Sequence, residues 1–166
     1  MIILGLDPGT ATTGYGLIRI ENKEFFVINY GLIETDKNHN SGKRLAEIYK
    51  KLSYIIKSYK PDTVSMEKIF FATNAKTAIA VGQAQGVMML VVNKFKLNLF
   101  EYAPGTIKKQ ISGNGRSDKK MMQKAVRKIL GPKIKSKKGE KTHFDNSADA
   151  LAIAICHAVS TGLIAV

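Results

Sequence analysis

The sequence contains one cysteine and no tryptophan among its 166 residues. The lone Cys156 excludes an intramolecular disulfide and fits a reducing compartment such as the cytosol. No apolar run approaches the roughly 20 residues of a membrane-spanning helix, and the N-terminus lacks the basic and apolar regions of a signal peptide. No basic amphipathic helix carries tryptophan anchors, which disfavours attachment to a membrane surface. We therefore expect a cytoplasmic protein without a membrane partner.

Acidic residues are scarce as well. There are 13 Asp and Glu residues against 26 Lys and Arg residues, which gives a net charge of +13. This excess favours a polyanionic partner, because lysine and arginine attract phosphates and release counterions on binding. Nucleic acid is the leading class of partner. Ribosomal proteins are also basic, so the charge alone does not identify the function.

The length and the 45% of hydrophobic residues favour a single domain, residues 1–166, around one core. Asn22-Lys23 is typical of a hairpin turn between two strands. Three successive strands followed by helices indicate an antiparallel meander that opens a mixed α/β sheet. We predict these three strands at residues 1–7, 15–20 and 25–33.

The rest of the chain alternates between helical and strand patterns. Ser41 and Ser117 are typical helix N-caps, and Pro61 ends the first helix. The long helix at 73–92 is rich in small residues, which favours close packing against either a second subunit or its own domain. The other predicted elements are strands at 63–67 and 97–102, helices at about 42–60, 104–111, 118–130 and 145–160, and a lysine-rich loop at 131–142.

Several of the few acidic residues stand at the ends of these elements. Asp7 closes the first strand and Glu67 closes the strand at 63–67, while Asp145 and Asp149 lie one helical turn apart. Carboxylates that converge at strand ends repel one another unless a cation lies between them, and Mg²⁺ prefers such oxygen ligands. Two ions about 4 Å apart can activate a water and stabilise the leaving oxygen of a phosphodiester. Taken singly, each acid is also typical of a turn, a cap or a helix N-terminus.

Six motifs stand in order across nearly the whole chain: Leu4–Thr10, Thr13–Gly16, Met66–Phe70, Gly82–Val87, Glu101–Pro104 and Ala148–Ala154. Together they resemble the RuvC family of Holliday-junction resolvases. The resemblance implies a ribonuclease H-like fold, with a mixed five-stranded sheet flanked by helices, in a homodimer. It implies paired symmetric nicks in four-way junction DNA with Mg²⁺ or Mn²⁺, alongside the RuvA and RuvB branch-migration proteins.

By this resemblance, Asp7, Glu67 and Asp149 match metal-binding carboxylates of the family. The fourth position carries Asp or His in the family, but here it is Asn146, which has a carbonyl oxygen without a charge. Three interpretations remain open. The adjacent Asp145 substitutes for it, three carboxylates suffice, or Asn146 replaces a natural acid in an inactive variant.

The resemblance also implies residues that hold DNA. Phe70 matches an aromatic position near the junction point, and an aromatic such as Phe70 or Phe71 can stack on an unpaired base. Lys108 and Lys119 match basic positions near the scissile phosphate, where a lysine can neutralise developing charge. Further phosphate contacts are expected from Lys109, Arg116 and Lys120. The lysine-rich loop is expected to follow a DNA arm.

Three alternatives remain. Actin-like ATPases share an Asp-x-Gly-Thr turn after the first strand, but they need two lobes and about twice this length. RuvC-like nucleases that act on RNA share the opening strand with Asp7. A junction-binding module without cleavage activity is favoured only by Asn146. Outside the candidate site, we expect Cys156 to be a small core residue and His143 to be an exposed loop residue.

Overall fold

The computed structural model describes residues 1–68, 75–131 and 141–164, and for residues 75–76 and 141–146 it describes the backbone alone. Five strands form one sheet in the order β3-β2-β1-β4-β5. β1, β2 and β3 are antiparallel neighbours, whereas β4 and β5 run parallel to β1. The mixed five-stranded sheet with an antiparallel meander first is confirmed. The strands are β1 (Ile2–Asp7), β2 (Thr12–Glu21), β3 (Glu24–Glu34), β4 (Thr63–Glu67) and β5 (Asn98–Tyr102).

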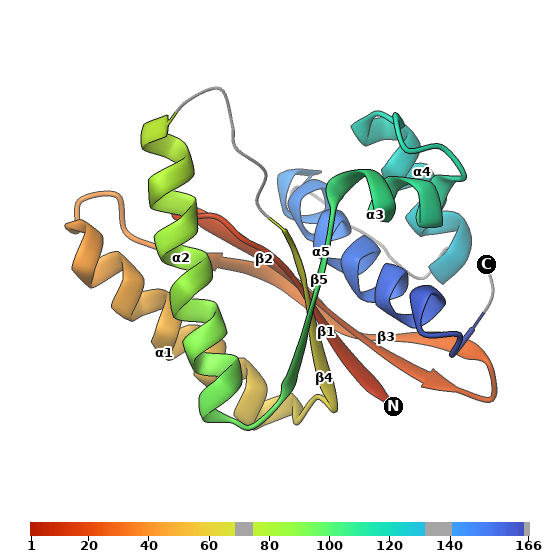
Figure 1. The fold of residues 1–166 in the computed structure, drawn as a ribbon, viewed down its shortest axis with the longest axis horizontal. Helices are drawn as coiled ribbons and strands as arrows, with labels where there is room; N and C mark the ends of the chain where they lie inside the picture. Colours follow the sequence, from red (N-terminus) through yellow and green to blue (C-terminus); the bar gives the residue numbers. More distant parts are fainter. Residues whose placement is uncertain (69–74, 132–140, 165–166) are drawn as a thin grey trace.

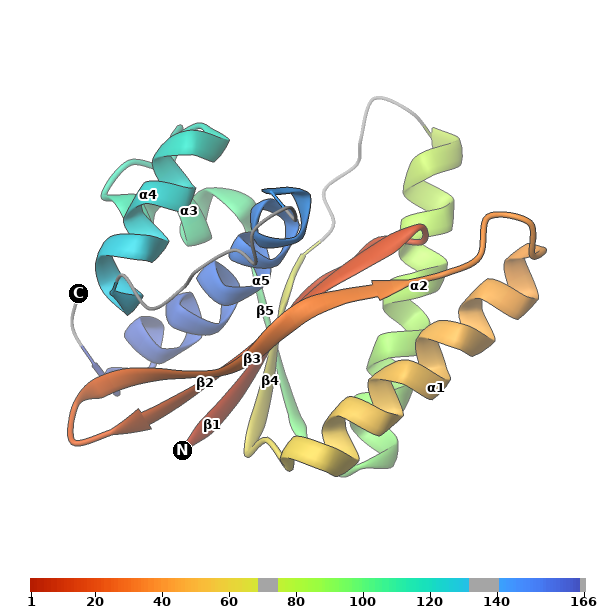
Figure 2. The same ribbon diagram turned by 180° about the vertical axis from the view of Figure 1, so that it is seen from behind.

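Helices cover both faces of the sheet (Figures 1 and 2). Two of them lie on one face, and the other three lie on the opposite face, with α5 directly against the strands. Each face therefore has its own apolar core. The first pair is α1 (Ser41–Tyr59) and α2 (Ala75–Lys94), and the second group is α3 (Pro104–Ser112), α4 (Lys119–Leu130) and α5 (Lys141–Ser160).

The turn between β2 and β3 confirms the predicted hairpin. Asn22 and Lys23 have φ angles of 53° and 60°. Two successive left-handed residues match the twist of the flanking strands in a type I′ turn. Both strands extend beyond the predicted bounds because their backbone pairing continues from Thr12↔Glu34 to Glu21↔Glu24.

Two predicted helix caps are wrong by one residue. Asn40, not Ser41, caps α1, because its side-chain oxygen accepts from Lys43 N at 2.9 Å. Asp118, not Ser117, caps α4 by accepting from Met121 N at 2.8 Å. The hydroxyl of Ser117 instead donates inside the preceding turn, so a neighbouring polar residue with better geometry takes the cap position.

Helix α5 begins at Lys141, four residues before its predicted start. The part of this helix whose side chains are described lies in the interior: from Ser147 to Ala158 every residue is buried except Asp149. A helix that is apolar on all sides belongs in the interior, and the expectation that Cys156 is a core residue is confirmed. None of the helices within residues 1–68, 75–131 and 141–164 is both long and apolar enough to span a membrane.

Candidate functional site

Asp7 and Glu67 lie side by side because their strands are parallel neighbours. The pairing of β1 with β4 places Leu6 opposite Met66, so the next residue on each strand is an acid at the same edge of the sheet. Leu6 and Met66 are fully buried and fix the strand ends. The two carboxyl groups hydrogen-bond to each other. The structure therefore brings together two of the acids that the sequence singled out.

Asp149 reaches this edge because α5 lies directly on a row of small residues. Gly16, Gly5 and Ser65 are paired across β2, β1 and β4, and we call them the small-residue row. A Cβ added to Gly5 would lie 2.1 Å from the carbonyl oxygen of Ala150, and one added to Gly16 would lie 2.8 Å from Leu151 N. Only glycine permits this approach of helix backbone to strand backbone.

Two polar contacts also hold α5 in place against the sheet. The buried hydroxyl of Ser65 donates to the carbonyl oxygen of Ile153 at 3.3 Å. At the edge of the sheet, the hydroxyl of Tyr102 lies 2.8 Å from His157 Nδ1, and the ring of Phe100 is 4.5 Å from the His157 ring. Burial lowers the pKa of His157, which favours the neutral ring that can accept from Tyr102. These contacts fix the helix that carries Asp149.

The carboxyl groups perturb one another strongly. Burial, followed by the charges of Glu67 and Asp149, raises the pKa of Asp7 to about 7. Burial and then the charge of Asp149 raise the pKa of Glu67. Lys119 acts against the shift at Asp7, and Lys108 acts against the shift at Glu67. Like charges gathered in a partly buried site are typical of functional carboxylates.

Two helices hold these lysines against the acids. Lys119, the first residue of α4, forms an ion pair with Asp149 at 3.6 Å. Lys108 of α3 joins Lys119, Glu67 and Asp149 in the lining of a pocket of about 230 Å³. The apolar side of the pocket is formed by Pro104, Ile107, Met122, Ala152 and Ile153. The pocket thus contains acids and cations over an apolar floor, an arrangement that can hold a metal ion beside a phosphate.

The other predicted site residues are placed differently. Lys109 lines another pocket, on the far side of α3, and is not part of the carboxylate pocket. Arg116 and Lys120 are exposed and line neither of these two pockets. The side chains of Phe70, Phe71, His143, Asp145 and Asn146 lie outside the described residues.

Two details correct the sequence interpretation. Because α5 begins at Lys141, Asp149 lies in its third turn, and a helix N-terminal role for Asp149 is wrong. Among the side chains that the structure describes, no three acidic, histidine or cysteine residues form a ready ligand set. Asp149 instead forms an ion pair with Lys119. The three carboxylates share an electrostatic environment, and a cation would compete with Lys119 for Asp149.

Sequence reasoning missed the small-residue row. Glycine in the interior of a strand is a signal of close backbone approach, and Gly5 and Gly16 both stand in predicted strands. The identity of the element that approaches them, α5, depends on long-range packing that no local pattern contains.

Comparison with known proteins points to one family. The family model described as "Crossover junction endodeoxyribonuclease RuvC" matches residues 3–157. A curated protein of that name from Caldicellulosiruptor saccharolyticus is 44% identical over 162 residues, covering 97% of this chain and 94% of the relative. The match includes nearly the whole of both chains.

Two solved structures share the fold. The Thermus thermophilus RuvC structure superposes with a TM-score of 0.85 at 26% identity, covering 98% of this chain and 96% of the other. T. thermophilus RuvC in complex with a Holliday junction substrate superposes with a TM-score of 0.84 at 24% identity, with the same coverage. The motifs, the fold and these matches agree, and the chain belongs to the crossover junction endodeoxyribonuclease RuvC family.

Proposed function

We propose that this chain resolves Holliday junctions by paired, symmetric nicks during DNA recombination and repair. Family membership makes it an endodeoxyribonuclease, a metal-dependent hydrolase of phosphodiester bonds. The observation that carries the proposal is the carboxylate group, in which Asp7 and Glu67 share a hydrogen bond and both feel the charge of Asp149. The net charge of +13 supports a DNA substrate.

The donor set fits a hard divalent cation. Carboxylate oxygens are the ligands that Mg²⁺ prefers, and Mn²⁺ accepts the same ligands. Mutual repulsion contributes to the raised pKa values of Asp7 and Glu67, and a cation would relieve it. We assign Asp7, Glu67 and Asp149, with Asn146 as a fourth oxygen donor, to a site for two Mg²⁺ ions. Such ions supply an activated water and neutralise the leaving oxygen.

The protein's own cations orient the phosphate beside these acids. Lys108 and Lys119 line the carboxylate pocket from α3 and α4, so a phosphate there meets two ammonium groups. We assign both lysines to the neutralisation of charge that develops on the reacting phosphate. The ion pair of Lys119 with Asp149 holds this lysine beside the pocket before DNA binds.

The DNA surface extends beyond this pocket. We assign phosphate contacts to the exposed Arg116 and Lys120, which flank the start of α4, and to Lys109 of α3. Phe70 and Phe71 remain the proposed stacking residues at the junction point, since they follow Glu67 by three and four positions.

Asn146 sets the expected level of activity. Because it lacks the charge of Asp, we expect weaker cation binding than in relatives that carry an acid there. Asn146→Asp should therefore raise the rate of cleavage at limiting Mg²⁺. Equal rates for the two proteins at both limiting and saturating Mg²⁺ would contradict this role. A complete lack of cleavage that Asn146→Asp restores would favour the second candidate, a junction-binding module.

The paired nicks require two copies of the site, and α2 offers the surface for a homodimer. Ile79 and Leu90 are 65% and 59% exposed. Gly82 and Gly86 lie between them on the exposed side, and a Cβ on either would meet nothing within 4 Å. Exposed glycines destabilise a helix unless another surface approaches closely. Leu90→Glu should shift the protein to monomers in analytical ultracentrifugation, whereas Tyr54→Glu on α1 should not.

The family resemblance also implies partners and a location. We propose that the dimer acts in the cytoplasm after RuvA and RuvB have moved the junction, because resolution needs an exposed crossover. The test is co-migration of the three proteins on a four-way junction in gel-shift experiments.

A labelled immobile junction and a duplex of matched sequence test the proposed function directly. We expect paired nicks in the junction alone with Mg²⁺ or Mn²⁺, and none with EDTA. Equal nicking of the duplex would contradict junction selectivity, and nicking of an RNA junction in preference to DNA would favour an RNA-directed nuclease. Retained nicking in EDTA would contradict the metal site.

A further inference from the structure

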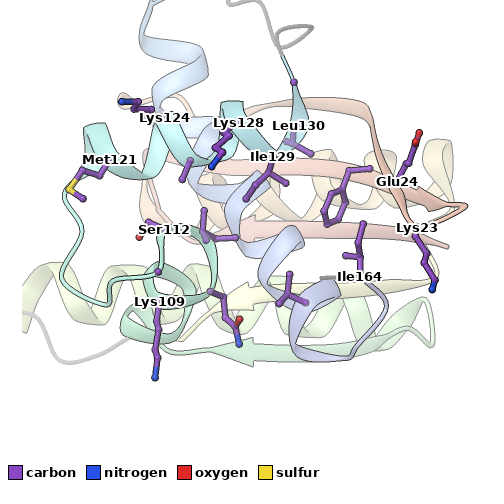
Figure 3. Close-up of a pocket in the computed structure, with 17 residues that line it drawn as sticks. Lys23, Glu24, Lys109, Ser112, Met121, Lys124, Lys128, Ile129, Leu130 and Ile164 are labelled. Carbon is purple, nitrogen blue, oxygen red and sulfur yellow. The ribbon is translucent and has the colours of Figure 1, made fainter. Parts of the chain in front are cut away.

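A second pocket, of about 1110 Å³, is lined by the residues drawn in Figure 3. Its walls come from α3, α4, the C-terminal end of α5 and the hairpin between β2 and β3. None of its lining residues lines the carboxylate pocket. Its volume exceeds the roughly 300–1,000 Å³ of small-molecule pockets, so it has room for a segment of polypeptide. We call it the lysine-rimmed groove.

The floor of the groove is apolar. Six of its apolar side chains are partly buried and pack against the core on this face of the sheet, and the seventh, Ile111, is a buried member of that core. Met121 adds a side chain that is 48% exposed at one end of the groove. An apolar strip that several partly exposed side chains share marks a binding site more often than a scattered exposed residue does. The strip consists of Phe25, Ile111, Ala125, Ile129, Leu130, Val159 and Ile164.

The rim of the groove is cationic. Lys124 and Lys128 stand one turn apart on α4 and Lys23 stands on the hairpin, while Lys109 of α3, which we assign to a DNA phosphate, also lines the groove (Figure 3). All four are exposed. Of the groove residues that the structure describes, Glu24 is the only acid. An occupant with carboxylates on its polar side therefore matches the rim in charge.

The combination of rim and floor selects among possible occupants. Residues 132–140, which follow directly after Gly131 at the groove, hold four lysines and one glutamate, so they carry the same charge as the rim. A DNA backbone would match the rim but would leave the apolar floor unused, because phosphate contacts require no apolar partner. An amphipathic helix with acidic residues beside an apolar face satisfies both.

We propose that the lysine-rimmed groove is a docking site for an acidic amphipathic helix of a partner protein. The helix places its apolar face on the floor between α4 and the hairpin and directs its carboxylates to Lys124 and Lys128. The groove shares no lining residue with the carboxylate pocket, which contains Lys108 and Lys119. Docking is therefore compatible with an accessible nuclease site.

Three fluorescein-labelled peptides of about four helical turns test this site by fluorescence polarisation. The first has glutamates beside a leucine face, the second has lysine in place of each glutamate, and the third has serine in place of each leucine. We expect measurable binding of the first peptide alone. Lys124→Glu with Lys128→Glu should weaken it by about tenfold or more at low salt, and Met121→Ser should weaken it several-fold.

A matched control carries the same change in net charge elsewhere. Lys50→Glu with Lys57→Glu alters two exposed residues of α1 on the opposite face of the sheet and should leave peptide binding unchanged. Junction cleavage by each variant reports that the protein is folded. Equal binding of the three peptides, or equal weakening by both double variants, would overturn the proposal. So would an absence of peptide binding together with loss of junction affinity in the α4 variant, which would make the groove a path for DNA.

Discussion

Replacement of Gly5 by alanine should disable cleavage while leaving most of the fold intact. The added Cβ would lie 2.1 Å from the carbonyl oxygen of Ala150, which is 0.9 Å short of the 3.0 Å that real contacts reach, and 2.8 Å from Ala154 N. Both atoms belong to the backbone of α5, so no side-chain rotation can relieve the contact. Helix α5 must move away from β1 by about 1 Å and must carry Asp149 with it.

The expected losses of cleavage rate and of stability follow from this displacement of α5. A misplacement of about 1 Å in a reacting group can cost roughly a hundredfold in rate, whereas overpacking of a core costs about 1–3 kcal/mol of stability. Single-turnover cleavage of a four-way junction at saturating Mg²⁺ measures the first effect, and urea unfolding measures the second. Junction affinity should change little, because the assigned lysines lie on α3 and α4.

Gly42→Ala is the matched control for this variant. Gly42 lies in α1, and an added Cβ would meet Asn40 Oδ1 at an ordinary 3.6 Å. Alanine at this helix position should leave cleavage unchanged and stabilise the protein by up to about 1 kcal/mol. Cleavage by Gly5→Ala at the rate of the unmodified protein would refute the claim that the contact of α5 with β1 sets the position of Asp149.

Three further predictions concern the carboxylates, the small-residue row that supports α5, and the lysines beside the site. Because the pKa of Asp7 rises from 3.8 unfolded to about 7 folded, the metal-free folded state holds an extra proton between these values. Its stability should fall by up to about 4 kcal/mol as pH rises from about 4 to about 7. Urea unfolding in EDTA measures this slope, which Asp7→Asn should reduce, while Glu67, whose pKa is also raised, keeps a part of it; a slope that Asp7→Asn leaves unchanged would exclude this cause. Ser65→Ala removes the hydroxyl that donates to the Ile153 carbonyl oxygen at 3.3 Å; because this carbonyl keeps its partner within α5, the loss should cost about 0.5–1.5 kcal/mol in the same unfolding assay, whereas unchanged stability would show that this contact does not restrain α5. Lys119→Met should lower the single-turnover cleavage rate far more than Lys120→Met, because only Lys119 lines the carboxylate pocket; equal losses would place both lysines in general DNA binding.

The sheet and half of the site could be predicted from the sequence because their signals are local. Asp7 and Glu67 each end an apolar strand, and parallel neighbouring strands end at the same edge. The caps were misassigned because Ser117 and Asp118 are both good cap residues, and the local turn decides between them. The start of α5 was missed because the preceding lysines and glycine resemble a loop.

The rest depended on contacts between distant parts of the chain. That Gly5 and Gly16 support α5 follows from a helix more than 130 residues away in sequence. Lys108 and Lys109 are neighbours in sequence, yet they face different pockets on two sides of α3. Only the packing of that helix distinguishes the lysine beside the acids from the lysine at the groove.

The rate of paired nicking in a four-way junction, measured against Mg²⁺ concentration, tests the central claim that Asp7, Glu67 and Asp149 hold the cation that cuts DNA. The Asp7→Asn variant should bind the junction normally, but its cleavage rate should fall by about a thousandfold or more. The reason is that the loss of a metal ligand removes several kcal/mol of transition-state stabilisation. Asp36→Asn, an exposed acid before α1, should behave as the unmodified protein does. Unimpaired Mg²⁺-dependent cleavage by Asp7→Asn would contradict the account.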